Sequence, residues 1–414
     1  MHRVVRWTVA AAVAATLAPA SAFALCAVSA CAPDGVQGSG AAYRVCMPEP
    51  SCWNGDLIVY AHGYVDFTQP LGIPEDQLSL PGGLSLPALT NALGFAFATT
   101  GYSVNGLAVQ QGVADVRDLV DVFAAQHGAP GRTYLVGPSE GGIVTALAIE
   151  RFPHVFSGGI AACGPIGSFQ GQLNYIGDFR VVFDYFFPGV IPGSPTVIPD
   201  EVITDWDAVY VPKIKQAVAA DPFRRDQLLA VTKAPFDAAV PSTKVDTIVG
   251  LLWYNAFGAN DATAKLGGQP FDNRTRIYRG STNDLLLNLL VRRFSADPAS
   301  LSEVRDNYET SGQLAVPLVT LHTTGDPIIP FGHDLLYSIK TAVTASSPLH
   351  DSLPVVRYGH CQFEPLEVLI ALIDLVIKVE GAAPPSLASA AARTPDGQRA
   401  KNAVLEAARR LGGK

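Results

Sequence analysis

Residues 134–152, YLVGPSEGGIVTALAIERF, run from an apolar segment through a glycine-rich turn into a segment with helical spacing. The apolar residues before Gly137 predict a buried strand, and the residues from Ile143 onward predict a helix. A strand that turns directly into a helix is typical of a parallel sheet covered by helices. Ser139 stands at the turn, between Gly137 and Gly141, where the absence of Cβ atoms permits a sharp change of direction.

The same alternation of strands and helices continues on both sides of this unit. Strands are predicted, in chain order, at 56–64, 94–102, 132–139, 156–165, 316–326 and 353–360. Helices are predicted at 107–126, 143–151, 331–345 and 364–380. This order predicts an α/β fold with a mostly parallel sheet flanked by helices.

A long interval separates the fourth and fifth predicted strands, and it is too long for a plain loop. Residues 168–312 are rich in aromatic residues and proline, and we interpret them as a large, mainly helical cap inserted between strands. The core is then formed by 25–167 and 313–380. The alternative is a separate second domain with its own core. Residues 381–414 are rich in Ala, Pro and Ser at first and predict a flexible C-terminal tail.

Composition limits the classes of partner. The chain has 414 residues, of which 48% are hydrophobic and 16% charged, so it can bury a large core. Its formal net charge is −8, and it contains no long run of Lys and Arg. Because binding to phosphate backbones needs clustered basic residues, we expect no nucleic-acid partner.

The N-terminus has the layout of a secretory signal peptide. Residues 1–24 combine Arg3 and Arg6 with an apolar, alanine-rich run and a small-residue site that ends at Ala24. The run is short for a membrane span and is broken by Pro19, so we expect no stable membrane insertion. The protein is therefore predicted to be secreted or periplasmic, with cleavage near Ala24. A lipoprotein anchor at Cys31 is the alternative.

The cysteines predict disulfides. Six are present: Cys26, Cys31, Cys46, Cys52, Cys163 and Cys361. An even number in an exported chain favours disulfide bonds, and we expect the pairs Cys46–Cys52 and Cys163–Cys361, with Cys26 and Cys31 left unassigned. The chain has neither a C-x-x-C pair nor an H-E-x-x-H motif. We therefore expect no metal and no cofactor.

The glycine-rich turn matches the G-x-S-x-G nucleophile elbow, which requires a strand before the serine and a helix after it. A glycine-rich turn with an idle serine is the alternative. A nucleophilic serine needs a base, and the base needs an orienting group. Asp326 and His360 each follow a predicted strand, at the edge of the sheet where Ser139 emerges. We therefore predict Ser139 as nucleophile, His360 as general base and Asp326 as orienting acid.

Two backbone N–H groups are predicted to stabilise an oxyanion. One belongs to Tyr64, which follows His62 and Gly63 at the end of an early strand. The other belongs to Glu140, immediately after the serine. The Glu140 side chain lies in the first turn of a predicted helix, and we interpret it as a carboxylate that interacts with the helix dipole.

The segments His62-Gly63-Tyr64, Gly137-Pro138-Ser139-Glu140-Gly141, Gly325-Asp326-Pro327 and Gly359-His360 together resemble the α/β-hydrolase family of serine esterases and lipases. The order Ser, Asp, His agrees with that family. A narrower likeness is to secreted tannases and feruloyl esterases, in which a cysteine follows the catalytic histidine, as Cys361 does here. Those enzymes also carry a cysteine just before the serine, where this chain has Pro138.

The resemblance implies a secreted hydrolase that cleaves small or polymeric carboxylic esters through an acyl-serine intermediate. Phe186 and Trp253, from the aromatic insertion, are expected to line the acyl pocket. A serine peptidase or amidase could use the same three residues. An inert binding protein is a further alternative, although it would be expected to lack one of them. The sequence leaves the oligomeric state open.

Overall fold

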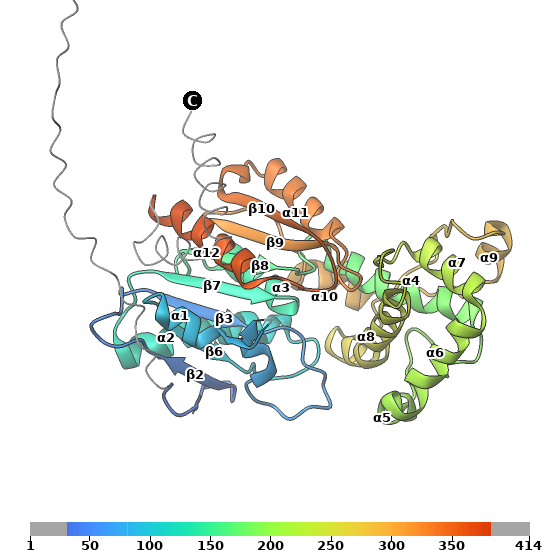
Figure 1. The fold of residues 1–414 in the computed structure, drawn as a ribbon, viewed down its shortest axis with the longest axis horizontal. Coiled ribbons are helices and arrows are strands. Elements are labelled where there is room, and N and C mark those ends of the chain that lie inside the picture. Colours follow the sequence, from blue (N-terminus) through green and yellow to red (C-terminus); the bar gives the residue numbers. More distant parts are fainter. Residues whose placement is uncertain (1–30, 81, 382–414) are drawn as a thin grey trace, which may run out of the picture.

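The computed structural model describes residues 31–80 and 82–381. The predicted signal peptide and the tail after Gly381 lie outside these residues. The described strands of the main sheet are β1 Gly35–Val36, β2 Ala42–Cys46, β3 Leu57–Ala61, β6 Ala96–Thr100, β7 Thr133–Pro138, β8 Gly158–Ala162, β9 Leu318–Gly325 and β10 His350–Tyr358 (Figure 1). Their order across the sheet is β1-β2-β6-β3-β7-β8-β9-β10. A small hairpin is formed by β4 Ser79–Leu80 and β5 Leu84–Ser85.

The sheet is parallel from β6 to β10, which confirms the predicted fold class. In its centre Tyr60 pairs with Val136, and Ala162 pairs with Leu321. This register brings the carboxyl ends of β7, β9 and β10 to one edge of the sheet. The antiparallel strands β1 and β2, at the other side of the sheet, were not predicted from the sequence.

Helices cover both faces of the sheet (Figure 1). Helices α2 Val109–His127, α3 Glu140–Arg151 and α11 Gly332–Val343 share one hydrophobic cluster with the sheet. Helices α1 Leu86–Ala92 and α12 Pro365–Glu380 share the cluster on the opposite face. Helix α2 shows why these segments are helical, since Val113, Val116, Val120 and Phe123 recur at steps of three and four and are all buried.

The chain between β8 and β9 is helical. It contains α4 Phe169–Phe186, α5 Asp200–Thr204, a π-helical turn at Trp206–Tyr210, α6 Val211–Ala220, α7 Pro222–Thr232, α8 Thr243–Lys265, α9 Asp284–Leu290 and α10 Pro298–Asn307. Most of this segment extends beyond the end of the sheet (Figure 1). It has a hydrophobic cluster of its own, which Ile328 and Ile329 of the β9–α11 loop join. Helices α4 and α8 therefore lie close to the edge where β7 and β9 end.

Two disulfides are formed within the described residues. Cys163–Cys361 confirms one prediction. The predicted Cys46–Cys52 pair is wrong, because Cys46 is bonded to Cys31. Cys46 ends the buried strand β2, and the N–H of Ala32 donates to Val45 O at 3.0 Å, which holds the preceding chain beside that strand. A cysteine sulfur that is bonded in a disulfide cannot also be bonded to a lipid. This bridge is therefore incompatible with the lipoprotein alternative at Cys31.

Apolar residues of the helices pack in the core of the protein. Among the helices of the described ranges, we find none with the length and apolar content needed to span a bilayer. Helix α12 is the most apolar of those that cover the sheet, and it buries Ala371, Leu375 and Val376 against β8 and β9.

Candidate active site

Ser139 lies at the sharp turn between β7 and α3. Its backbone has φ 57° and ψ −122°, a conformation that residues other than glycine rarely adopt. The glycines on either side are needed because the backbone packs closely here. A Cβ on Gly137 would lie 2.2 Å from the Gly141 carbonyl oxygen, and a Cβ on Gly141 would lie 2.0 Å from the Ala61 oxygen. The turn therefore depends on both glycines and holds the serine at the edge of the sheet.

The structure brings the three predicted side chains together. The distance from Ser139 Oγ to His360 Nε2 is 2.9 Å, and His360 Nδ1 lies 2.7 Å from Asp326 Oδ2. The three residues come from the loops after β7, β9 and β10, which end at the same edge of the parallel sheet. Their order, hydroxyl to imidazole to carboxylate, is the one in which the imidazole can accept the serine proton.

Asp326 is fully buried and has a complete set of hydrogen bonds. Its Oδ1 accepts from the backbone N–H groups of Ile328 and Ile329, at 2.9 and 3.0 Å. Burial by itself would raise the pKa of this carboxyl, but the nearby imidazoles of His360 and His322 outweigh that effect and lower the pKa to about 2. Asp326 is therefore ionised at neutral pH and can stabilise a positive imidazole.

His322 is a second histidine beside Asp326, and it is not among the predicted site residues. It lies inside β9, with Nε2 3.5 Å from Asp326 Oδ2 and 2.8 Å from the carbonyl oxygen of Ile329. The carbonyl can only accept, so Nε2 carries a proton and donates it. A histidine four residues before an aspartate at a strand end is no recognisable motif, so the sequence carried no signal for this contact.

The loop after β3 lies against the nucleophile. A Cβ on Gly63 would be 3.3 Å from the Ser139 Cβ. Gln77 holds this loop, because its Oε1 accepts from Gly63 N–H at 2.7 Å and its Nε2 donates to Tyr64 O at 3.3 Å. Within the described residues, the N–H groups of Tyr64 and Glu140 have no hydrogen-bond acceptor. Two free donors thus belong to residues beside Ser139. Gln77 was not identified from the sequence, where nothing distinguishes it.

The Glu140 side chain differs from its interpretation as a dipole-stabilised carboxylate. It is buried, its Oε1 accepts from Ala108 N–H at 2.8 Å, and its Oε2 has no partner among the described residues. Burial raises the pKa of Glu140 to about 8, even though the Ala108 hydrogen bond and the charge of Lys265 lower it. Burial therefore disfavours the carboxylate form on which the dipole interpretation depends.

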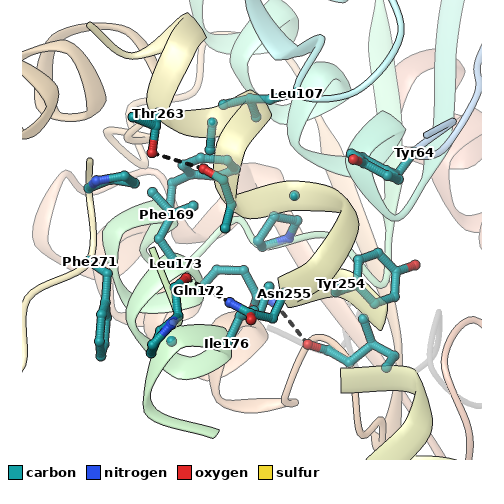
Figure 2. Close-up of a pocket in the computed structure, with 18 of the residues that line it drawn as sticks. Tyr64, Leu107, Phe169, Gln172, Leu173, Ile176, Tyr254, Asn255, Thr263 and Phe271 are labelled. Atoms are coloured by element: carbon teal, nitrogen blue, oxygen red, sulfur yellow. Dashed lines mark hydrogen bonds between the residues drawn. The ribbon is translucent and has the colours of Figure 1, made fainter. Parts of the chain in front are cut away.

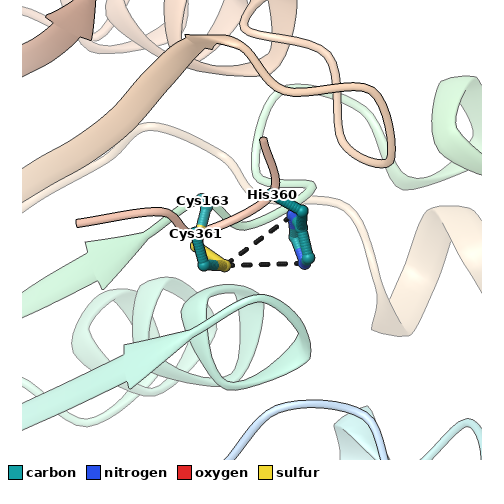
Figure 3. A group of neighbouring side chains, drawn as sticks. All are labelled: Cys163, His360 and Cys361. Atoms are coloured by element: carbon teal, nitrogen blue, oxygen red, sulfur yellow. Dashed lines mark hydrogen bonds between the residues drawn. A yellow bond between two sulfur atoms is a disulfide. The ribbon is translucent and has the colours of Figure 1, made fainter. Parts of the chain in front are cut away.

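The Cys163–Cys361 disulfide packs directly against the histidine (Figure 3). Cys361 Sγ lies 3.5 Å from His360 Nε2 and 3.7 Å from Nδ1. The bridge ties the loop that carries His360 to the end of β8. These three side chains are close enough to surround a metal ion, but the sulfurs are bonded to each other and the thiolate form needed for metal binding is lost.

Two cavities meet at Ser139. The first, of about 130 Å³, lies between the serine and helices α4 and α8 (Figure 2). The second, of about 350 Å³, lies between the sheet and helices α1 and α12. The apolar residues of the first include Leu107, Phe169, Leu173, Ile176 and Phe271, and those of the second include Leu86, Leu93, Phe97, Val136 and Leu372.

Ser139, Tyr64 and Tyr254 line both cavities, whereas His360 lines only the second. Phe186 and Trp253 line neither, so their expected place in the acyl pocket is wrong. Phe186 is buried in the hydrophobic cluster of the helical segment. Trp253 stacks on Phe257 instead, with ring centroids 4.9 Å apart.

The sheet order, the strained serine between β7 and α3, and the acid and histidine after β9 and β10 settle the fold. The chain has the α/β-hydrolase fold. No protein-family model matches the chain, and no curated protein matches it.

Solved structures with a likeness to this chain include a feruloyl esterase B from Aspergillus oryzae, with 18% identity, a TM-score of 0.43 and coverage of 85% of this chain and 80% of that one. An esterase from Aspergillus oryzae has 15% identity, a TM-score of 0.44 and coverage of 84% and 78%. An acylaminoacyl peptidase from Pyrococcus horikoshii has 11% identity and a TM-score of 0.38, with coverage of 80% of this chain and 38% of that one.

Proposed function

We propose that this chain is a secreted serine hydrolase that cleaves carboxylic esters through an acyl-serine intermediate. The observation that carries the proposal is the hydrogen-bonded series Ser139, His360 and Asp326 at the carboxyl edge of the sheet. An inert binding protein would have no need of a strained serine beside a buried, ionised acid and an imidazole.

In the proposed mechanism His360 accepts the Ser139 proton as Oγ attacks the ester carbonyl. Asp326 stabilises the positive imidazole that forms. The negative charge on the carbonyl oxygen is received by the N–H groups of Tyr64 and Glu140. His360 then returns the proton to the leaving alcohol, and water hydrolyses the acyl-serine in the second half of the reaction with His360 again acting as base.

The two cavities allow the parts of the substrate to be assigned. The leaving oxygen must lie within reach of His360, which lines only the second cavity. We therefore place the alcohol in the second cavity, between the sheet and helices α1 and α12. The acyl chain then occupies the first cavity, between the Ser139 edge of the sheet and helices α4 and α8.

The character of these cavities supports an apolar ester over a peptide. Among the described residues, no Lys, Arg or Asp side chain lines either cavity, and the one glutamate present, Glu140, is mostly neutral at neutral pH. A peptide would bring many polar backbone groups that need partners, and an apolar cavity leaves such groups unsatisfied. An uncharged substrate with apolar groups on both sides of the ester bond suits both cavities.

Secretion is supported by the disulfides. The Cys31–Cys46 and Cys163–Cys361 bridges fit an oxidising compartment. The signal peptide predicted over residues 1–24 lies outside the described residues, and it is supported by its sequence layout. Intact-mass analysis of the exported protein should show a mature chain that begins after Ala24.

The proposal is tested with purified mature protein and two substrate panels: p-nitrophenyl esters of increasing acyl length and aminoacyl anilides. We expect turnover of the esters and little turnover of the anilides. Rapid hydrolysis of anilides together with no hydrolysis of esters would contradict the ester assignment and support a peptidase.

A further inference from the structure

Helix α9 lies at the end of the helical segment farthest from the sheet (Figure 1), and several of its leucines are exposed to solvent. The side chains of Leu285 and Leu289 are 83% and 75% exposed, and Leu286 and Leu290 are exposed beside them. Leu287, on the opposite side of the helix, is fully buried and anchors it. Contiguous exposed apolar residues are uncommon on soluble proteins and mark surfaces that bind something.

The apolar surface continues onto the neighbouring loop. Ile277 is exposed and lines, together with Leu285, a shallow depression of about 450 Å³. Arg274, Arg276 and Arg293 line the same depression, so arginine side chains and apolar side chains form one surface. We name this surface, Ile277 with Leu285, Leu286, Leu289 and Leu290, the α9 patch.

The surroundings of the α9 patch are basic, although the protein as a whole has a net charge of −8. Residues 272–294 contain five arginines, two aspartates and no other charged residue. All five arginines are exposed. In the part of the chain that the structure describes, Arg279 and Arg292 form no ion pair, so their charge is available to a partner. Four of the five arginines, Arg274, Arg276, Arg279 and Arg293, line the same depression as Leu285.

The patch rests on an ordered base. The Arg293 guanidinium donates to the backbone oxygens of Asn273 and Asn288 and lies 5.2 Å from the centre of the Tyr278 ring. The Tyr278 hydroxyl donates to Asp178 of α4 at 2.6 Å. These contacts fix the position of the segment that carries the leucines, so their exposure is a defined feature of the fold.

We propose that the α9 patch docks on an anionic lipid surface, with the leucines entering the interface and the arginines contacting the lipid headgroups. Apolar burial and attraction between basic residues and anionic lipids are the two forces that bind peripheral helices to membranes, and both are present here. Among possible occupants, an anionic lipid surface is favoured because the charge around the patch is opposite to that of the whole protein.

The chain segment that carries the patch is connected to the first cavity. Phe271, which begins the chain segment leading to the patch, lines that cavity and packs against Gly177 of α4. Phe271 therefore connects the segment that carries the patch to the cavity that reaches Ser139. A use of this connection in catalysis rests on the proposed function, but the docking itself does not, so the two are tested separately.

The test is vesicle flotation with full-length mature protein, which needs no turnover. The probes are phosphatidylcholine vesicles with and without about 30% phosphatidylglycerol. The variant Leu285→Gln/Leu289→Gln removes the leucines, and Ile339→Gln/Val343→Gln on α11 is the matched control, since those residues are also exposed, at 59% and 81%. Thermal unfolding checks that both variants fold.

We expect the wild type and the α11 control to float with anionic vesicles and to be released by high salt. The α9 variant should bind at least about tenfold more weakly. Arg279→Gln/Arg292→Gln should weaken binding by about tenfold or more on anionic vesicles alone. The proposal is overturned if the wild type does not bind, or if both leucine and α11 variants lose binding equally. Self-association that is abolished by the α9 variant, without vesicle binding, would also overturn it and assign the patch to a second copy.

Discussion

His360 Nδ1 lies 2.7 Å from Asp326 Oδ2, and this contact joins two loops that follow different strands. Asp326 has no exposed surface, and its pKa of about 2 keeps it ionised across the whole physiological range. The imidazole is therefore held with its Nδ1 proton toward Asp326 and its Nε2 free to accept the Ser139 proton. The contact with Asp326 therefore fixes the orientation of the His360 ring.

The first prediction concerns this orientation. Asp326→Asn should keep the fold but present an N–H to Nδ1, which favours the wrong tautomer of His360. We expect kcat to fall by about 10⁴-fold, the loss seen when this change is made in serine hydrolases with the same three residues. Steady-state kinetics on a p-nitrophenyl ester measure it. Asp334→Asn is the matched control, since Asp334 is also buried and bonds to Ser352. A comparable loss of kcat in both variants would contradict the specific role of Asp326.

The second prediction follows from Glu140. An acid whose pKa is higher in the folded protein than in the unfolded chain stabilises the fold at low pH, and this stabilisation is lost as pH rises through the folded pKa. For Glu140 the window extends from its ordinary value of 4.5 to about 8. The wild type should therefore lose a few kcal/mol of unfolding free energy, relative to Glu140→Gln, as pH increases from about 5 to about 9.

Denaturant unfolding of both proteins at several pH values measures this difference. The other titrating groups are shared, so their contributions cancel. Because the substitution retains the backbone N–H, the ester activity of Glu140→Gln should remain close to that of the wild type. A wild-type stability that stays constant or rises with pH relative to Glu140→Gln would show that Glu140 is ionised in the folded protein.

The third prediction separates the two disulfides. Replacing both cysteines of either pair with alanine should destabilise the protein by about 2–4 kcal/mol. Only Cys163→Ala/Cys361→Ala should also lower kcat, by about tenfold to hundredfold, because that bridge packs on the His360 ring and holds its loop. Cys31→Ala/Cys46→Ala is the control at a distance from the site. Equal kcat in the two variants, measured well below their unfolding temperatures, would remove the positioning role of the Cys163–Cys361 bridge.

The fourth prediction tests the assignment of the cavities. A Cβ on Gly258, which lines the first cavity, would meet no heavy atom within 4 Å, so Gly258→Leu is expected to extend a side chain into that space. We expect kcat/KM for long acyl esters to fall roughly tenfold while acetate esters are hardly affected. Ser79→Phe, at the second cavity, should instead reduce activity on esters of bulky alcohols. The opposite pattern of selectivity would contradict this assignment and place the acyl chain in the second cavity and the alcohol in the first.

Much of the core could be predicted because its signals are local. Gly137 and Gly141 cannot be replaced, because a Cβ there would lie 2.2 Å and 2.0 Å, respectively, from a backbone oxygen. Two glycines at this spacing around a serine can be recognised in the sequence. Asp326 and His360 were identifiable because parallel strands end at one edge of the sheet. Their loops could be located from the apolar runs that precede them, without knowledge of any side-chain contact.

The errors came from features that depend on contacts between distant segments. The Cys31–Cys46 bridge depends on the antiparallel strand β2, which is short and lacks a clear alternation. Gln77 and His322 act through hydrogen bonds that no spacing encodes. Phe186 and Trp253 were placed in the acyl pocket from their aromatic character. The helical segment has a hydrophobic core of its own, and both side chains pack in or against that core instead.

The most direct test of the central claim is active-site labelling with a fluorophosphonate, read by mass spectrometry and compared with ester hydrolysis in the same samples. The wild type should be labelled on Ser139, and Ser139→Ala should take no label and lose about 10⁶-fold in kcat. The account would be contradicted by full ester hydrolysis in Ser139→Ala, or by labelling of a different residue that abolishes activity while Ser139 stays unmodified.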